Sequence, residues 1–223
     1  MADKEIYNAI FISPDTISDI RDRLSDIGVD VLQGDREISA PHITLEYRGA
    51  ESLSDYFGAS ADIKVTGYSH NGPPDSDKQG AVEGVSVEII FKGDNAEFLQ
   101  TKFEDMENVR NETCGRECGF DLHITMSTTD GMPPVETGYC YFEALPEDKQ
   151  FVIEGGIFGG FMGSVDGEPV IDIGDKEYSE LSNDIIDISD YNEDTSPDAD
   201  IDNIDNIDDL DYVDNDDDYG YDF

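Results

Sequence analysis

Two short strings in the sequence consist of His-Ile-Thr followed by an apolar residue, at residues 42–45 and 123–126. An imidazole is suited to proton transfer near neutral pH, because its ordinary pKa is about 6.5. A hydroxyl beside it can donate a hydrogen bond to an oxygen on which negative charge develops. His42 and His123, with Thr44 and Thr125, are therefore candidate catalytic and substrate-binding residues for acid–base attack on a phosphodiester.

Both strings are expected to lie on strands, where residues i and i+2 face the same side. The histidine and threonine of each string then project together, and the apolar residues between them face the core. Arg48 and Ser127 continue these two faces and are further candidates for binding substrate. Arg48 can hold a phosphate or pair with Glu46, and the sequence leaves both interpretations open. Two such strands, related by a pseudo-two-fold axis, would place two imidazoles around one space.

The residues before each string predict a similar succession of elements. The apolar runs 6–12 and 85–91 each predict a strand, and the segments 14–27 and 95–109 carry apolar residues at helical spacing. The distance from Pro14 to His42 is 28 residues, and so is the distance from Asn95 to His123. We therefore expect two strand–helix–strand units, within pseudo-repeats at about 5–70 and 81–165, that share one core.

The predicted fold class is α+β. Further strand-like runs at 61–68 and 151–162 extend the two units. They predict a bilobal domain over residues 1–171, in which mainly antiparallel sheets line a central groove. Pro73 and Pro74 mark a surface loop between the halves.

The charge of the chain limits its partners. It has 54 acidic and 13 basic residues, and its formal net charge is −41. Residues 172–223 hold 21 of the acids and one base, Lys176, so the rest of the chain still carries −21. This acidity excludes the basic surface that duplex DNA or long RNA requires, and it disfavours anionic membranes. The same carboxylates are expected to favour imidazolium and so to raise the pKa of both motif histidines.

The sequence shows no sign of export or of membrane insertion. It contains no run of 18 apolar residues, and its first residues lack the pattern of a signal peptide. Three cysteines are an odd and low number, which is typical of a reducing compartment. We therefore expect a cytoplasmic protein.

Residues 172–223 are dominated by Asp and predict a disordered acidic tail. Apolar residues recur there every three positions, which fits neither a helix nor a strand. The ending DNDDDYGYDF resembles the acidic C-terminal tails of single-strand DNA-binding proteins. An alternative function is thus an acidic interaction or decoy protein, whose tail binds a protein partner in nucleic-acid machinery. Adaptation to a salty cytoplasm would explain the acidity differently.

The paired His-Ile-Thr strings resemble the two-histidine (2H) phosphoesterase superfamily, whose signature is two His-x-Thr/Ser motifs, each on a strand. The second copy continues HITMSTTDGMPPVETGY, which looks like the cyclic-phosphodiesterase branch associated with RNA repair. The resemblance covers roughly residues 5–165. It implies that the protein hydrolyses 2′,3′-cyclic phosphate ends or small cyclic oligonucleotides without a metal or cofactor. Some phage members of the superfamily degrade such cyclic oligonucleotides. His42 and His123 would be catalytic, Thr44 and Thr125 would bind phosphate, and the substrate would be a small nucleotide or an RNA 3′ end.

Three cysteines and one motif histidine also contain the elements of a zinc site, namely Cys114, Cys118, His123 and Cys140. Cys-x3-Cys is an unusual spacing for zinc, and the metal would remove His123 from catalysis. We therefore predict no metal ligands.

Overall fold

The computed structural model describes residues 7–29, 34–47, 53–73, 80–104, 108–110, 112, 120–129, 131–166 and 168–191. Residues Met1–Asn192 belong to one compact unit, and residues 193–223 lie outside the described residues. No helix in the described part of the chain is long and apolar enough to cross a membrane.

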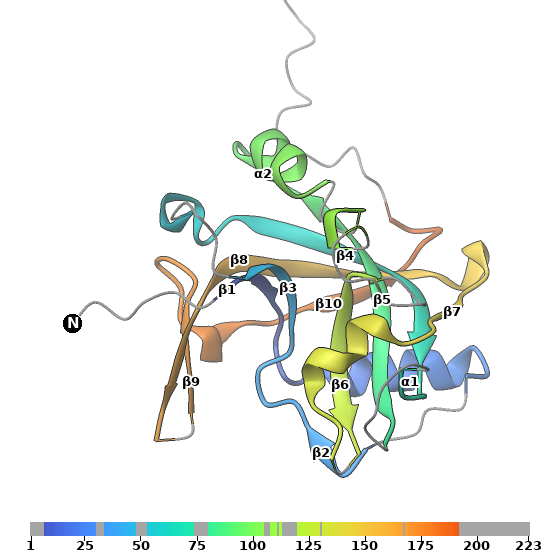
Figure 1. The fold of residues 1–223 in the computed structure, drawn as a ribbon. Coiled ribbons are helices and arrows are strands. Elements are labelled where there is room, and N and C mark those ends of the chain that lie inside the picture. Colours follow the sequence, from blue (N-terminus) through green and yellow to red (C-terminus); the bar gives the residue numbers. More distant parts are fainter. Residues whose placement is uncertain are drawn as a thin grey trace, which may run out of the picture. The chain divides into compact units, whose positions relative to one another are not determined.

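The described strands form one open sheet in which every pairing is antiparallel (Figure 1). Two strands carry the motifs, and two long strands lie at the centre. The order is β2 (Arg36–Glu37), β6 (His123–Thr128), β5 (Val82–Phe91), β4 (Ser60–Ser69), β8 (Phe151–Val165), β1 (Tyr7–Phe11) and β3 (His42–Tyr47). Three shorter strands complete it: β7 (Glu143–Ala144) pairs with β4, and β9 (Glu168–Asp172) and β10 (Asp184–Asp187) pair with β8. The mixed helix and antiparallel-sheet architecture predicted from the sequence is confirmed.

Both predicted strand–helix–strand units are present. Strand β1 leads through α1 (Thr16–Asp26) to β3, and β1 pairs with β3. Strand β5 leads through α2 (Ala96–Phe103) to β6, and β5 pairs with β6. The strands that follow the two units, β4 and β8, pair with each other, so the units lie on opposite sides of that central pair.

Each motif strand carries a β-bulge at the same place. The extra residue is Leu45 in β3 and Met126 in β6, and each is the third residue after its histidine. Both side chains are buried in the main core. A bulge bends a strand and increases its twist, so both strands change direction just beyond the threonine of the motif.

The two helices contribute to one core with the sheet, although α2 is shorter than predicted. Ile17, Ile20 and Leu24 of α1 lie in the main core with Leu99 and Phe103 of α2. Two other apolar residues of the segment 95–109 lie outside this core: Phe98 is 45 % exposed and Val109 is 55 % exposed. The helix ends at Phe103, and residues 105–107 lie outside the described residues.

The fold continues past the boundary that was predicted at residue 172. Residues 172–191 complete β9, form a 3-10 turn at Tyr178–Glu180 and add β10 to β8. The prediction that this segment is disordered was wrong, because strand pairing and packing of its isolated apolar residues against the core offset the cost of ordering it. The predicted disorder of residues 192–223 falls outside the described residues.

Polar side chains of this segment attach it to the start of α1. Asn183 Oδ1 accepts hydrogen bonds from the backbone amide of Ser13 (2.8 Å) and from the hydroxyl of Thr16 (3.1 Å). Its Nδ2 donates to the carbonyl oxygen of Glu154 at 2.8 Å. The hydroxyl of Tyr178 donates to the carbonyl oxygen of Ile12 at 3.0 Å. Asn183 thus satisfies groups at the helix start that no residue within the helix can satisfy.

Replacing Asn183 with alanine should destabilise the protein. The change leaves the amide of Ser13 unpaired, and Ser13 is buried. An unpaired buried group costs about 1–3 kcal/mol, and each kcal/mol lowers the melting temperature of a domain of this size by about 2–4 °C. Thermal unfolding monitored by circular dichroism measures the effect. The control is Ser182→Ala, which changes an exposed neighbour. Equal melting temperatures in the two variants would contradict this role of Asn183.

Candidate active site

The two His-Ile-Thr motifs line one cavity of about 850 Å³. Strand β3 places His42 and Thr44 on its wall, and β6 places His123 and Thr125 there. The apolar residue between each pair, Ile43 or Ile124, is fully buried in the main core. The alternation of a strand therefore turns each histidine and threonine toward the cavity. The two His–Thr pairs, which are far apart in the sequence, come together in this way.

Each histidine is held by the same hydrogen bond. His42 Nδ1 lies 2.7 Å from the carbonyl oxygen of Ala40, and His123 Nδ1 lies 2.8 Å from the carbonyl oxygen of Asp121. A carbonyl oxygen only accepts, so Nδ1 carries the hydrogen in both rings. Nε2 is then the nitrogen left to accept or donate a proton at the cavity. The same tautomer and the same kind of partner occur in both halves.

The two rings differ in their aromatic neighbours. His42 stacks on Tyr7, with ring centroids 5.0 Å apart and an interplanar angle of 22°. His123 contacts the ring of Phe120 edge-on at 5.6 Å, at an angle of 71°. Gly138 permits this packing, because a Cβ there would lie only 2.8 Å from Cε1 of His123. Each imidazole is therefore fixed in orientation by packing as well as by its hydrogen bond.

Burial lowers the pKa of both histidines. It lowers the pKa of His42, and it lowers the pKa of His123 to about 4. The positive charges of Arg110 and of His42 act in the same direction on His123. The expectation that carboxylates raise both values was wrong, because loss of hydration penalises imidazolium more strongly than the surrounding acidity favours it.

Arg110 is a residue of the cavity that the sequence analysis did not find. Its Nη2 donates to the carbonyl oxygens of Leu45 (2.7 Å) and Thr44 (3.3 Å), at the bulge of β3. Its guanidinium carbon lies 4.4 Å from the ring centroid of Phe120, the residue that also contacts His123. Arg110 thus connects the strand of the first motif to the surroundings of the second. The residues around Arg110 in the sequence are mostly polar or charged, as on a solvated helix face, and they do not predict this role.

Ser127 does not line the cavity, contrary to the prediction. Its side chain is fully buried, and its hydroxyl donates to Glu83 Oε2 at 2.5 Å and accepts from the amide of Gly34 at 2.7 Å. The extra residue Met126 shifts the alternation of β6, so Ser127 no longer continues the face of Thr125. Arg48, the other predicted binding residue, lies outside the described residues.

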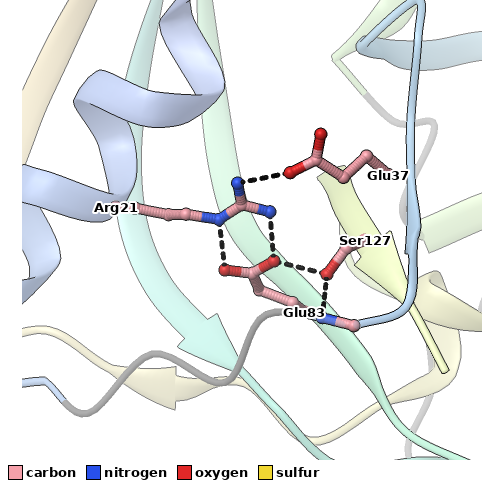
Figure 2. Close-up of polar contacts among 5 residues, drawn as sticks. Arg21, Glu37, Glu83 and Ser127 are labelled. Carbon is pink, nitrogen blue, oxygen red and sulfur yellow. Dashed lines mark hydrogen bonds and ion pairs between the residues drawn. The ribbon is translucent and has the colours of Figure 1, made fainter.

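The interactions of Ser127 belong to a polar network that holds β2 beside the cavity (Figure 2). Arg21 of α1 donates to both oxygens of Glu83, at 2.8 and 2.7 Å, and to Glu37 Oε1 at 3.0 Å. Glu37 lies on β2, and its neighbour Arg36 lines the cavity. Arg36 and Arg110 line the cavity of a chain whose net charge is −41, together with the carboxylates of Glu37 and Glu46. Side chains of both signs therefore face this space.

The sequence predicts no metal ligands. No group of three or more His, Cys, Asp or Glu side chains within the described residues could hold a metal ion. Cys140 is buried, and its sulfur donates to the carbonyl oxygen of Glu136. Cys114 and Cys118 lie outside the described residues.

Comparison with protein-family models, with curated proteins and with solved structures finds no match for this chain. Its function is therefore inferred from the residues of the cavity and their geometry.

Replacing Arg110 with methionine should raise the pKa of His123. The arginine carries a positive charge that disfavours imidazolium, while methionine keeps the site filled without charge. Titration of the histidine Cε1–H signals by NMR measures this pKa directly. Arg110→Lys is the matched control, because lysine preserves the charge, and it should keep the pKa of His123 low. An unchanged pKa in Arg110→Met would show that burial alone sets the value.

Proposed function

We propose that this protein is a phosphodiesterase that hydrolyses 2′,3′-cyclic phosphate ends or small cyclic oligonucleotides by two-histidine acid–base catalysis, without a metal ion. One observation supports this most strongly. Two imidazoles, each with Nδ1 bonded to a backbone carbonyl, line a single cavity together with two threonines. The resemblance to the 2H phosphoesterases implies a site made of the same two histidines and two threonines.

His123 is assigned as the general base. A base must be neutral before the reaction, and burial together with Arg110 keeps the pKa of His123 near 4. Its Nδ1 hydrogen is directed at a carbonyl, so Nε2 holds the lone pair. Nε2 removes a proton from a water molecule as the water oxygen attacks phosphorus.

His42 is assigned as the general acid. Its ring stacks on Tyr7, and the face of an aromatic ring attracts a cation. A bound phosphate anion also favours imidazolium and counteracts the effect of burial. His42 Nε2 gives its proton to the ester oxygen as the bond from phosphorus to that oxygen breaks. Exchange of protons with solvent then restores neutral His123 and charged His42.

The threonines and arginines stabilise the charge that builds on the phosphoryl oxygens. Thr44 and Thr125 each present a hydroxyl on the face of the adjacent histidine. The hydroxyl of Thr125 makes only a long contact, 3.5 Å, to the carbonyl oxygen of Pro134, so it is free to turn toward a phosphate. Arg36 and Arg110 attract the anion into the cavity. A volume of about 850 Å³ suits a small nucleotide or the end of an RNA chain.

His42→Ala and His123→Ala should each lower kcat by about 10²–10⁴, the usual cost of losing a general acid or base. The losses should not add in the double variant, because both residues serve one proton-transfer sequence. Hydrolysis of 2′,3′-cyclic nucleotides and of small cyclic oligonucleotides in EDTA measures the effect. The control is His70→Ala, since His70 does not line the cavity. Absence of hydrolysis of every such substrate by the wild-type protein would overturn the proposed function.

The dependence of kcat/KM on pH should be bell-shaped, with its optimum on the acidic side of neutrality. The acidic limb reports protonation of His123, so activity should fall only below about pH 4. The alkaline limb reports loss of the proton from His42, and burial lowers that pKa too. Arg110→Met should move the acidic limb to higher pH. A profile with both limbs above pH 7 would contradict the assignment.

A further inference from the structure

A row of nearly parallel aromatic rings begins at His42 and lines the cavity. Tyr7 stacks on His42 on β3 and also on Phe161 of β8, with a centroid separation of 4.7 Å and an angle of 12°. The ring of Tyr47 lies 6.4 Å from that of Tyr7, at an angle of 20°. Tyr7, Tyr47 and Phe161 all line the cavity. These three residues are called the aromatic platform below.

The outer part of the platform is exposed. Tyr47 is 60 % exposed, which makes it one of the few large apolar side chains at the surface of the described residues. Tyr7 and Phe161 are partly buried and pack against the core cluster of Phe11, which is itself fully buried and in contact with His42. An exposed ring at the rim of a cavity offers a planar apolar surface to a ligand rather than to the core.

The hairpin of β8 and β9 forms a wall beside the platform. It projects to the lower left in Figure 1, and its residues Ser164 and Pro169 line the cavity together with Phe161. The cavity therefore has lining surface besides the two histidines and their threonines, and its volume of about 850 Å³ exceeds what a phosphate alone requires.

We propose that the aromatic platform, with the β8–β9 hairpin beside it, is a subsite that binds a nucleobase of the substrate by stacking. The inference rests on the proposed function, because the base would belong to the nucleotide whose phosphate lies between the histidines. Every nucleobase has a flat π surface, and aromatic side chains bind such surfaces whatever the base sequence. The platform begins one ring away from His42, so a base attached to that phosphate lies within its reach.

The absence of tryptophan from the chain provides a direct test. Tyr47→Trp introduces the one tryptophan of the chain on the platform, and a stacked base should quench the fluorescence of this tryptophan. Titration with AMP should quench the fluorescence to saturation, whereas ribose 5-phosphate and inorganic phosphate, which have no base, should not. The control is Phe98→Trp, which places the fluorophore on an exposed ring of α2 outside the cavity. AMP should leave this control unchanged.

A kinetic variant tests the same subsite without a new fluorophore. Tyr47→Ala should lower the ratio of kcat/KM for a 2′,3′-cyclic nucleotide to kcat/KM for its abasic analogue. A base stacked on an aromatic side chain accounts for about tenfold to hundredfold in binding, and the ratio should fall by that factor. Tyr47 is exposed, so its replacement should leave the fold intact, and circular dichroism verifies this.

The outcomes separate the subsite from the proposed function. No quenching by AMP, or equal quenching by ribose 5-phosphate, overturns the subsite while hydrolysis through His42 and His123 can still stand. Quenching by AMP without hydrolysis of any phosphodiester supports the subsite and overturns the proposed function. An unchanged kinetic ratio in Tyr47→Ala also overturns the subsite.

Discussion

The pairing of β8 with its neighbours is the constraint on which the rest of the structure depends. Strand β8 pairs with β4 and β1 at the centre of the sheet, and with β9 and β10 as well. Its glycines permit this close approach: a Cβ on Gly156 would lie 2.8 Å from Ile10 Cγ2, and one on Gly159 would lie 2.6 Å from Ile173 Cγ2. Because β8 joins both halves, the two motif strands are held around one cavity.

Local burial, rather than total charge, determines the electrostatics of that cavity. The chain carries a net charge of −41, yet the histidines lie in surroundings that lower their pKa values, and two arginines line the same space beside Glu37 and Glu46. Loss of hydration and a nearby guanidinium act at short range, whereas distant surface carboxylates are screened by water and salt.

The two halves of the site are alike in backbone and different in side chains. Each has a bulge three residues after its histidine and an Nδ1 hydrogen bond to the carbonyl two residues before it. Beyond the bulge, β6 contributes Ser127 to the buried network of Arg21 and Glu83, while β3 continues to exposed Tyr47 at the cavity rim. Equivalent backbones thus position the two histidines, and unlike side chains surround them.

The sequence by itself determined the local elements and the chemistry of the motifs, because periodicity and residue type act over a few neighbouring positions. It located β1, β3, β5 and β6, both helices, and the His–Thr pairs that share a strand face. The tertiary structure alone decided four things: the role of Arg110, the burial of Ser127, the ordering of residues 172–191 and the direction of the histidine pKa shifts. Each of these depends on contacts between residues distant in the chain, or on how much water reaches a side chain, and neither is encoded in local spacing.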